Sequence, residues 1–455
     1  MEPARPEAIA QAAARVDAAS GSIYHTVVSF KERPYWMDTT SIPAGDPASR
    51  LPDSVDVAVI GGGITGLSAA LALARRGAKV AVLEAETFGW GASSRNGGMV
   101  LTGLKKGPET LIARYGLETA RRLYAASLAS IDCVEKLVNE EGIACDFART
   151  GHLEVAVKPK HFEGFMRSAE VIAREFNHTL RIVPKKELGE EIGSSLYHGG
   201  MVDEASAGVN PARYVAGLRQ ATARAGAMLF DRTRVEAIES RGPVSQISTS
   251  RGTLAAQAVF VATSGYTGAA TLALHRRIIP IGSYIIATQP LAGNLARAVS
   301  PRDRMIYDSK NFLHYFRLTP DRRMLFGGRA AFFPETANTI RESATILRQA
   351  MSQVYPVLRE AEVEYAWGGT LDFAFDVMPH AGQIDGLYYA LGYAGHGVAM
   401  ATYLGARMAE VISGDRHANP FDGLPFPTAP LGLYNGRPWF LPFAAAWYKF
   451  LDWAT

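Results

Sequence analysis

The chain has 455 residues and a mass of 49.1 kDa, more than a single hydrophobic core usually serves, so two or more domains are expected. Hydrophobic residues make up 48% of the sequence and charged residues 20%, a composition that excludes a disordered chain. The formal net charge of +3 is small for this length and gives no electrostatic reason to expect nucleic acid as a partner.

The sequence holds two cysteines, Cys133 and Cys145, which cannot form a disulfide framework or a CxxC redox or zinc site. We therefore expect a reducing compartment and no metal centre. The N-terminus carries acids and a proline where a signal peptide needs an unbroken apolar stretch, which predicts a cytoplasmic location. Because no run of about 18 apolar residues occurs, no transmembrane segment is expected.

The first predicted elements follow a polar lead-in that ends in a Pro/Gly/Asp-rich linker. Residues 55–60 (VDVAVI) have the β-branched, apolar character of a buried parallel strand. Residues 64–77 repeat apolar positions at helical spacing and stop at Gly77. Residues 79–84 (KVAVLE) have the pattern of a second buried strand. This order of strand, helix and strand predicts one βαβ unit.

The middle of the chain begins with an amphipathic helical pattern from about Pro108 to Gly142, and VEAIES, QISTSRG and AQAVFVATSG then have the composition of strands. Between about Ile281 and Pro356 the pattern changes to longer strands followed by one helix, which predicts a second, antiparallel-rich domain inserted in the first. The final third returns to a strand, GLYYALGY, and a helix, GVAMATYLGARMAEVISG, which would close the nucleotide-binding domain.

A glycine-rich motif joins the first strand to the first helix. Gly61, Gly63 and Gly66 follow the GxGxxG pattern: the first permits a tight turn, the second lets backbone approach a pyrophosphate, and the third lets the helix pack close to the strand. Free N–H groups and the positive end of the helix dipole then face the phosphates. Glu84 ends the second strand, where an acid can accept hydrogen bonds from ribose hydroxyls. These features predict a dinucleotide site, with NAD and FAD both open.

A second glycine-rich stretch, FGWGASSRNGG at residues 88–98, follows the acid by a few residues. At this point the sequence resembles the D-amino acid oxidase superfamily and, within it, the γ-glutamylputrescine oxidase-like amine oxidases, which favours FAD over NAD. The resemblance extends from about Tyr35 to the C-terminus. Its further landmarks are ATSGYTG, YFRLTPDRRMLFGG, YAWGG, GYAGHGV and PLGLYNGRPWFLP.

The resemblance implies an α/β fold of two domains, a Rossmann-type FAD-binding domain with an inserted antiparallel-sheet substrate domain, as in D-amino acid oxidase. Together with the patterns above, it predicts a lead-in at 1–54, a discontinuous FAD-binding domain at 55–105, 200–280 and 357–420, a substrate domain at 106–199 and 281–356, and an aromatic C-terminal tail at 421–455.

The motif and the resemblance together imply that FAD is held by the glycine-rich stretches, by backbone near the adenine, and by the start of the last helix. The dipole of that helix would stabilise negative charge on the flavin ring. The stretch YAWGGTLDF has no cysteine where several relatives carry one that binds the flavin covalently, so noncovalent FAD is expected. The implied residues are Gly61, Gly63, Ile64, Thr65, Gly66, Glu84, Ala85, Gly91, Ala92, Ser93, Ser94, Asn96, Gly97, Gly98, Met99, Val235, Ala262, Thr263, Gly265, Gly392, Gly395, Gly397 and Val398.

Oxidation of an amine needs the neutral amine, so the site must lower an ammonium pKa or supply a base. The strand FLHYFRL places Tyr315 and Arg317 on one face, and by the resemblance it borders the substrate cavity, so this pair is expected to bind a substrate carboxylate. A purely structural Arg317 is the alternative. His396 is a candidate base, or is held by its own backbone contacts. Lys310 and Trp367 are further candidates, for oxygen activation and for a cavity wall.

The resemblance implies an FAD-dependent oxidase of an amine or amino acid, with γ-glutamyl diamines among the candidate substrates. A hydride would pass from the carbon bearing nitrogen to the flavin, the imine would hydrolyse, and oxygen would be reduced to hydrogen peroxide. Two alternatives stay open: a dehydrogenase with another electron acceptor, and a subunit that binds FAD without turnover. The aromatic tail, with Trp439, Trp447 and Trp453, is expected to dock on the protein body rather than at a membrane interface.

Overall fold

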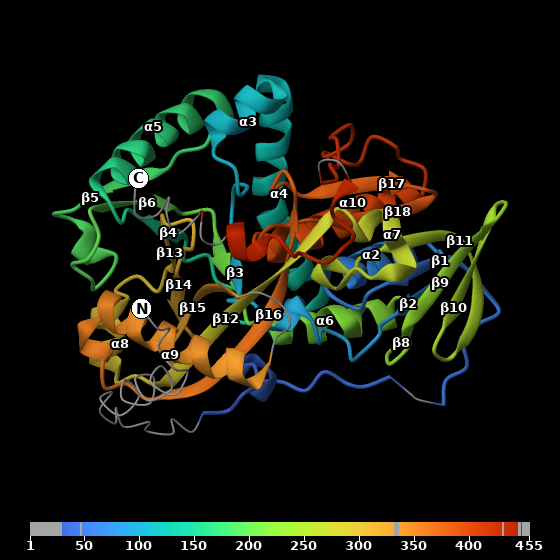
Figure 1. The fold of residues 1–455 in the computed structure, drawn as a ribbon, viewed down its shortest axis with the longest axis horizontal. Helices are drawn as coiled ribbons and strands as arrows, with labels where there is room; N and C mark the ends of the chain where they lie inside the picture. The colour runs from blue at the N-terminus through green and yellow to red at the C-terminus, as the bar shows by residue number, and fades with distance from the viewer. Residues whose placement is uncertain (1–29, 46–47, 332–335, 430–431, 445–446, 448–455) are drawn as a thin grey trace, which may run out of the picture.

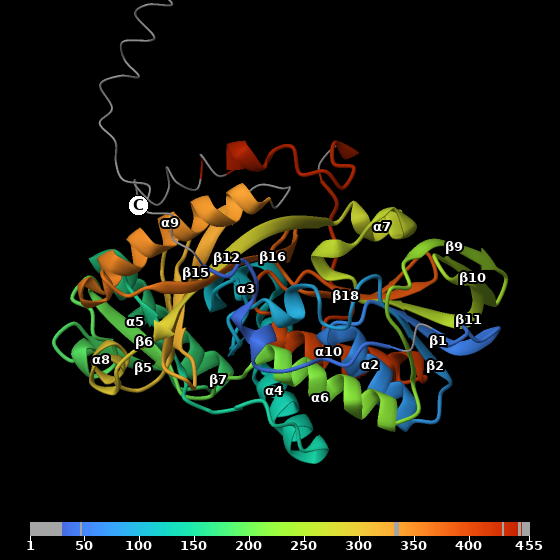
Figure 2. The same ribbon diagram turned by 90° about the horizontal axis from the view of Figure 1, so that it is seen from below.

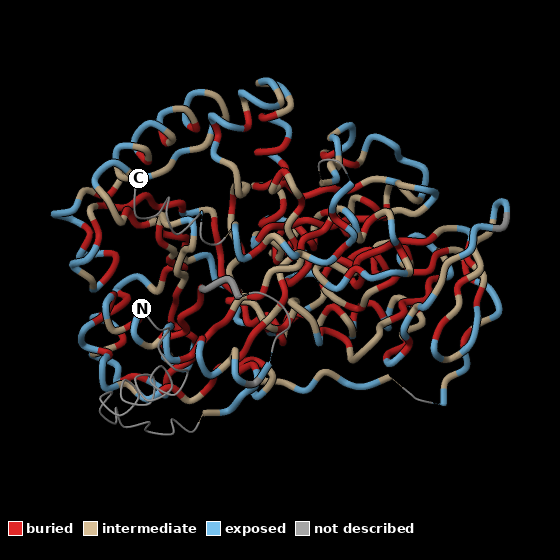
Figure 3. The backbone as a smooth tube through the Cα atoms, in the orientation of Figure 1, coloured by how far each residue is buried: buried red, intermediate tan, exposed pale blue. Residues whose placement is uncertain are grey.

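The computed structural model describes two eight-stranded sheets that lie side by side (Figure 1), and buried residues run through the strands of both (Figure 3). The described residues are 30–45, 48–331, 336–429, 432–444 and 447. Residues 1–29, on which the expectation about a signal peptide rests, lie outside them, as does Trp453. Among the residues that the structure describes, no helix combines the length and the apolar character that crossing a membrane requires.

The first sheet is built around the predicted strand–helix–strand unit. β1 (Ser54–Ile60) and β2 (Val80–Leu83) are parallel neighbours joined by α2 (Ile64–Arg75), as predicted. The sheet runs in the order β17 (His380–Ile384), β18 (Leu387–Leu391), β11 (Gly252–Val261), β1, β2 and β8 (Met228–Phe230), and β11 also pairs with β10 (Val244–Thr249), which pairs with β9 (Val235–Arg241). Because β1, β2 and β11 are parallel, their last residues meet at one edge, where ligands bind in such sheets.

Helices cover one face of this sheet and bury a large apolar core against it. α2 packs against α10 (Gly397–Ile412) and α6 (Pro211–Arg224), and α10 packs against α4 (Leu117–Glu141). The predicted helix at 108–142 is two helices, α3 (Pro108–Tyr115) and α4, because Gly116 between them has a φ of +78°.

The second sheet is antiparallel apart from its β13–β4 pair. Its order is β16 (Val363–Ala374), β12 (Ile278–Pro290), β15 (Arg323–Ala331), β14 (Tyr315–Leu318), β13 (Met305–Asp308), β4 (His152–Val155), β6 (Gly199–Asp203) and β5 (Arg181–Pro184). α9 (Ala337–Val354) packs against β12, β15 and β16, and α5 (Pro159–Phe176) against β5 and β6. Among the described residues, the remaining strands are β3 (Met99–Val100) and β7 (Ala207–Gly208), which pair with each other, and the remaining α-helices are the short α7 (Leu272–His275) and α8 (Gly293–Val299).

The sheets depart from the predicted domain boundaries in three places. The sequence patterns predict that residues 200–203 and 363–374 belong to the FAD-binding domain. They lie instead in β6 and β16 of the second sheet, where their hydrogen-bond partners are β4, β5 and β12. Conversely α4, within the predicted substrate domain, packs its apolar side against α10 on the first sheet. Apolar periodicity reveals that a helix is amphipathic, but not which sheet it covers.

Both ends of the described chain pack against the second sheet. Lys31 forms an isolated bridge with Tyr365 of β16, and Trp36 is fully buried beside it, so this part of the lead-in is more than a linker. In the tail, Tyr434 and Leu441 are buried against Ile279, which supports docking on the body (Figure 2). The tail still exposes Trp439, Phe443 and Trp447.

Candidate cofactor and substrate site

The predicted glycine turn closes tightly between β1 and α2. Gly61 has a φ of +107°, and a Cβ there would lie 2.6 Å from the carbonyl oxygen of Ala262. A Cβ on Gly66 would lie 1.9 Å from the carbonyl oxygen of Gly61. No side chain fits at either position unless the backbone moves, so the steric roles predicted for the first and third glycines are confirmed.

The middle glycine of the motif lets the second glycine-rich loop approach the start of α2. A Cβ on Gly63 would lie 2.6 Å from the Oγ of Ser93, and this Oγ accepts a hydrogen bond from the backbone N–H of Ile64 at 3.0 Å. Ser93 therefore fastens the two loops together at the N-terminus of a helix, where backbone N–H groups favour an anion.

Glu84 lies at the end of β2, as predicted, and faces the same turn. Its Oε2 accepts a hydrogen bond from the N–H of Gly62 at 2.6 Å, and its Oε1 accepts one from the N–H of Glu86 at 2.8 Å. Burial raises the pKa of Glu84, and these backbone N–H groups lower it. The Glu84 carboxylate also lines the cavity, so it can both hold the turn and accept a hydrogen bond from a ribose.

Asn96 organises the second glycine-rich loop. Its side-chain N–H groups donate to the carbonyl oxygens of Ala92 and Ser93, both at 3.0 Å, and its Oδ1 accepts from the N–H of Gly98 at 2.8 Å. The indole N–H of Trp36 donates to the backbone oxygen of Asn96 at 2.8 Å. The loop is therefore held by its own side chain and by the lead-in.

A third loop approaches the cavity at the start of α10. The carboxylate of Asp372, on β16, accepts hydrogen bonds from the N–H groups of Gly392 at 2.7 Å and Tyr393 at 3.2 Å. Burial raises the pKa of Asp372 to about 6, and these N–H groups lower it. This side chain thus links the second sheet to the loop that begins α10, whose first residues line the cavity.

All three loops line one cavity of about 1390 Å³ between the two sheets. It contains eighteen of the twenty-three residues predicted to bind FAD, every one except Gly66, Ser94, Gly98, Gly265 and Gly392. These five residues lie behind the cavity wall and shape it. For example, a Cβ on Gly265 would lie 2.8 Å from the carbonyl oxygen of Leu371. The cavity also takes in Phe440, Leu441 and Ala444 from the tail.

The catalytic candidates do not all meet in the cavity. Tyr315 lines it, and its hydroxyl lies 3.2 Å from the Oγ of Ser283. Burial raises the pKa of Tyr315 to about 12, so its hydroxyl keeps its proton at neutral pH. Lys310 also lines the cavity, but its ammonium lies 3.2 Å from the carboxylate of Asp308 and is already paired.

Arg317 and Trp367 are not cavity residues, so the expected positions of both are wrong. The Nη1 of Arg317 donates to the backbone oxygens of Gly98 at 2.8 Å and Val209 at 3.2 Å, behind the second glycine loop. The indole N–H of Trp367 donates to the backbone oxygen of Arg95 at 2.9 Å. Strand alternation correctly put Arg317 on the same face as Tyr315, but β14 carries it past the cavity and under the loop.

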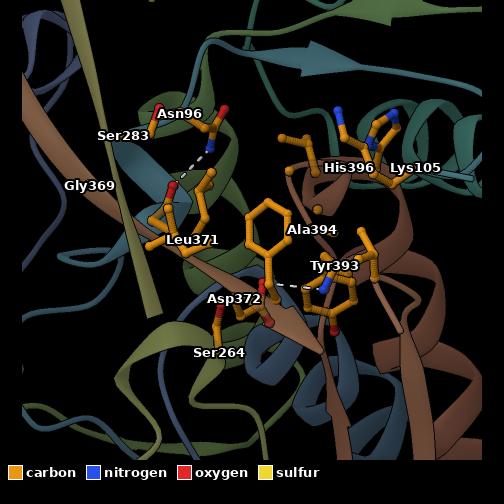
Figure 4. A pocket seen from close by; sticks show the side chains of 18 of the residues that line it. Asn96, Lys105, Ser264, Ser283, Gly369, Leu371, Asp372, Tyr393, Ala394 and His396 are labelled. Carbon is orange, nitrogen blue, oxygen red and sulfur yellow. Dashed lines mark hydrogen bonds between the residues drawn. The ribbon is translucent and has the colours of Figure 1, made fainter. Parts of the chain in front are cut away.

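His396 reaches the cavity from the residue before α10, beside Lys105 (Figure 4). Burial, with a smaller effect from the positive charge of Lys105, lowers the pKa of His396 to about 3, so the imidazole is neutral at physiological pH. Its Nδ1 is buried and has no hydrogen-bond partner among the described residues.

Sequence reasoning missed a polar wall on the second sheet. His152 and Glu154 of β4 and Tyr307 of β13 line the cavity, and the Tyr307 hydroxyl lies 3.3 Å from Nε2 of His152. Burial raises the pKa of Glu154 to about 7, with smaller effects from Lys105, Asp308 and Tyr307. The alternation of polar and apolar residues in HLEV carried a signal for this wall, but the strand is only four residues long.

The residues present fit FAD. The turn after β1 has no room for side chains. A helix N-terminus and the Glu84 carboxylate face the cavity, as a pyrophosphate and a ribose require. The second glycine-rich loop also lines the cavity. The cavity then continues from these loops to the face of the second sheet, so that a ring system and a substrate can share it.

Comparisons with known proteins agree with this geometry. The sequence matches the family described as DAO, FAD dependent oxidoreductase, over residues 56–411. It is 32% identical over 431 residues to the "Probable oxidoreductase OrdL" of Haemophilus influenzae, covering 92% of this chain and 97% of that protein. It is 30% identical over 411 residues to the gamma-glutamylputrescine oxidoreductase of Escherichia coli strain K12, covering 89% of this chain and 95% of that protein.

Among solved structures, the glycine oxidase of Geobacillus kaustophilus superposes with a TM-score of 0.69 at 22% identity, covering 83% of this chain and 99% of that one. The L-proline dehydrogenase of P. horikoshii does so with a TM-score of 0.65 at 22% identity, covering 80% of this chain and 94% of that one. These likenesses confirm the predicted α/β fold. The chain therefore belongs to the DAO family of FAD-dependent oxidoreductases, and FAD is its cofactor.

Proposed function

We propose that the protein is an oxidase of an amine or amino acid, that it transfers electrons from a C–N bond to oxygen, and that γ-glutamyl diamines are among its substrates. The observation that carries the proposal is the single cavity that joins the dinucleotide loops to the face of the second sheet. The 30% identity to a gamma-glutamylputrescine oxidoreductase over 89% of the chain supports the substrate class. Bound FAD would supply the hydride acceptor and would reduce oxygen to hydrogen peroxide.

The cavity wall near Tyr315 favours the neutral amine. A Cβ on Gly97 would lie 3.2 Å from the Tyr315 ring, so the second glycine loop and β14 enclose this part of the cavity between them. Burial also lowers the pKa of Lys105 elsewhere on the wall of the same cavity, the direction expected for an ammonium group that loses water. A substrate ammonium that enters the cavity would lose its proton more easily for the same reason.

Tyr315 remains the proposed contact of the reacting amine, and His396 lies beside Lys105 on the cavity wall. The protonated Tyr315 hydroxyl can donate a hydrogen bond to the amine nitrogen or accept one from it. His396, with a pKa near 3, is too weakly basic to hold the proton that leaves the amine, so its role would be to accept a hydrogen bond. Desolvation, rather than a strong base, would then supply the neutral amine.

Arg317 does not bind the α-carboxylate of a substrate, because its guanidinium is bound to backbone oxygens outside the cavity. Arg95 lines the cavity, yet it donates to the backbone oxygens of Trp90 at 2.8 Å and Gly368 at 3.1 Å. These assignments favour an amine over an α-amino acid as the group that reacts.

A peroxide assay with the purified holoenzyme tests the proposal. The assay compares four classes of compound in air: polyamines, γ-glutamyl amines, N-methyl amino acids and D-amino acids. We expect the protein to release peroxide with one or more of the amines. Turnover that needs an artificial dye and releases no peroxide would show that the protein passes its electrons to an acceptor other than oxygen. A protein that binds FAD and oxidises none of the compounds under either condition would be a non-catalytic subunit, and the proposal would be wrong.

A further inference from the structure

Two opposite charges share the cavity wall at a distance from Tyr315. Glu154 lies on β4, which is two strands beyond β14 in the second sheet. Leu153 and Val155 enter the core on one face of β4, so Glu154 points from the other face into the cavity. Lys105 reaches the same cavity from the segment between β3 and α3.

Neither charge forms an ion pair with any of the described residues. On the same wall, the ammonium of Lys310 lies 3.2 Å from the carboxylate of Asp308, so these two charges form an ion pair. Glu154 has only a hydrogen bond with Tyr307, and the ammonium of Lys105 has no hydrogen-bond partner among the residues that the structure describes. Charged side chains away from bulk water are normally paired, so these two are exceptions.

Burial acts against both charges. It raises the pKa of Glu154 and lowers that of Lys105, and each group partly offsets the effect on the other. Both groups line the same cavity and form no ion pair with each other. A ligand with an ammonium and a carboxylate close together would pair both charges at once. A ligand with only one of these groups would leave Glu154 or Lys105 unpaired.

We propose that this end of the cavity binds an amino-acid head group of the substrate, with Glu154 as the ligand of its ammonium and Lys105 as the ligand of its carboxylate. This inference rests on the proposed function, because it assigns the end of the substrate that does not react. Since Glu154 lies two strands away from Tyr315, the head group and the reacting amine occupy different parts of an elongated site.

Four derivatives of putrescine, acylated on one nitrogen, separate the two contacts. The acyl groups are γ-glutamyl, glutaryl, 4-aminobutyryl and butyryl, which carry at the same chain position both charges, the carboxylate alone, the ammonium alone, or neither. With the wild-type holoenzyme, each charge should raise kcat/KM by about tenfold to a hundredfold, as expected for a charged hydrogen bond in a buried site. The effect should lie in KM, because the contact is remote from the reacting carbon.

Two neutral variants then assign the residues. Glu154→Gln should lose the preference for substrates with the ammonium and keep the preference for the carboxylate, and Lys105→Met should do the opposite. Both variants remove an unpaired charge from the cavity wall, so they are expected to fold. Glu163→Gln and Lys160→Met remove the same charges from exposed positions of α5 and serve as matched controls.

A binding measurement keeps the inference testable without turnover. γ-Glutamylbutylamide has the head group and no terminal amine, and its binding to the oxidised holoenzyme can be followed by titration calorimetry. It should bind more tightly than N-butylbutyramide, and each of the two variants should weaken it about tenfold or more. Equal binding of the two amides, or variants that slow all four putrescine derivatives alike, would overturn the assignment. If no amine is oxidised but the amide binds as described, the proposed function fails and the head-group site stands.

Discussion

The Nη1 of Arg317 lies 2.8 Å from the carbonyl oxygen of Gly98, the last glycine of the second glycine-rich loop. The same nitrogen also donates to Val209 at 3.2 Å, and the side chain is almost fully buried. Burial lowers the pKa of Arg317 to about 10, so the guanidinium is still charged at neutral pH. A residue whose sequence pattern indicated substrate binding therefore supports the cofactor loop.

Replacing Arg317 with methionine should weaken FAD binding, because two buried carbonyl groups then lose their donor. The loss of these hydrogen bonds costs about 1–3 kcal/mol, so the dissociation constant for FAD should rise roughly tenfold to a hundredfold. Titration of the apoprotein with FAD, followed by flavin fluorescence, measures this change. The ratio of kcat/KM between carboxylate-bearing and plain amines should not change, and a selective loss for the carboxylates would show that Arg317 contacts substrate.

Gly63→Val should abolish FAD binding, since its side chain would collide with Ser93 and fill the turn that faces the cofactor. The measured quantity is the flavin-to-protein absorbance ratio after purification. Gly189→Ala is the matched control, because a Cβ at Gly189 would meet nothing within 4 Å. Full flavin content in Gly63→Val would rule out the proposed placement of the dinucleotide.

FAD should be released from the protein by acid. Cys133 and Cys145 do not line the cavity, and the stretch YAWGG contains no cysteine. After precipitation with acid, the yellow colour should remain in the supernatant. Colour that stays with the precipitate would identify a covalent bond, with His152 and His396 as the cavity histidines to examine first.

Glu154 should make the folded protein less stable as the pH rises from about 4.5 to about 7. Its pKa is about 7 in the folded protein against an ordinary value of 4.5, mainly because of burial, so the folded state keeps a proton that the unfolded chain has lost. Lys105 opposes this shift, and Asp308 adds to it. Compared with wild type, Glu154→Gln should therefore gain about 1–3 kcal/mol of unfolding free energy across this window and no more above it.

Denaturant unfolding of the two proteins between pH 4.5 and pH 8 checks this prediction, with Glu163→Gln as the control for net charge. A wild type and a Glu154→Gln variant with parallel pH profiles would show that water or another group already compensates the carboxylate.

The central strands β1 and β2 of the first sheet could be predicted from local sequence because they are short, buried and continuous in apolar character, whereas β8 and β17 were not predicted. The turn at Gly61 and the acid at Glu84 follow from steric and hydrogen-bonding requirements that a dinucleotide imposes on nearby residues. The membership of β6 and β16 in the second sheet could not be predicted, because pairing with strands that lie tens of residues away in the chain leaves no trace in a local pattern.

The same limit explains the polar wall. Lys105, Glu154 and Tyr307 come from three separate segments of the chain, and only the pairing of β4 with β13 brings two of them together. For Arg317 the pattern gave the correct face of the strand, but the path of that strand under the Gly98 loop decides what the guanidinium contacts.

The account is tested most directly by adding γ-glutamylputrescine to the oxidised holoenzyme under strictly anaerobic conditions and following the visible absorbance of the flavin. We expect the flavin absorbance to disappear on mixing and to return when air is admitted, with release of hydrogen peroxide. A flavin that stays oxidised with this compound and with every other amine in the panel would contradict the claim that the cavity oxidises a C–N bond.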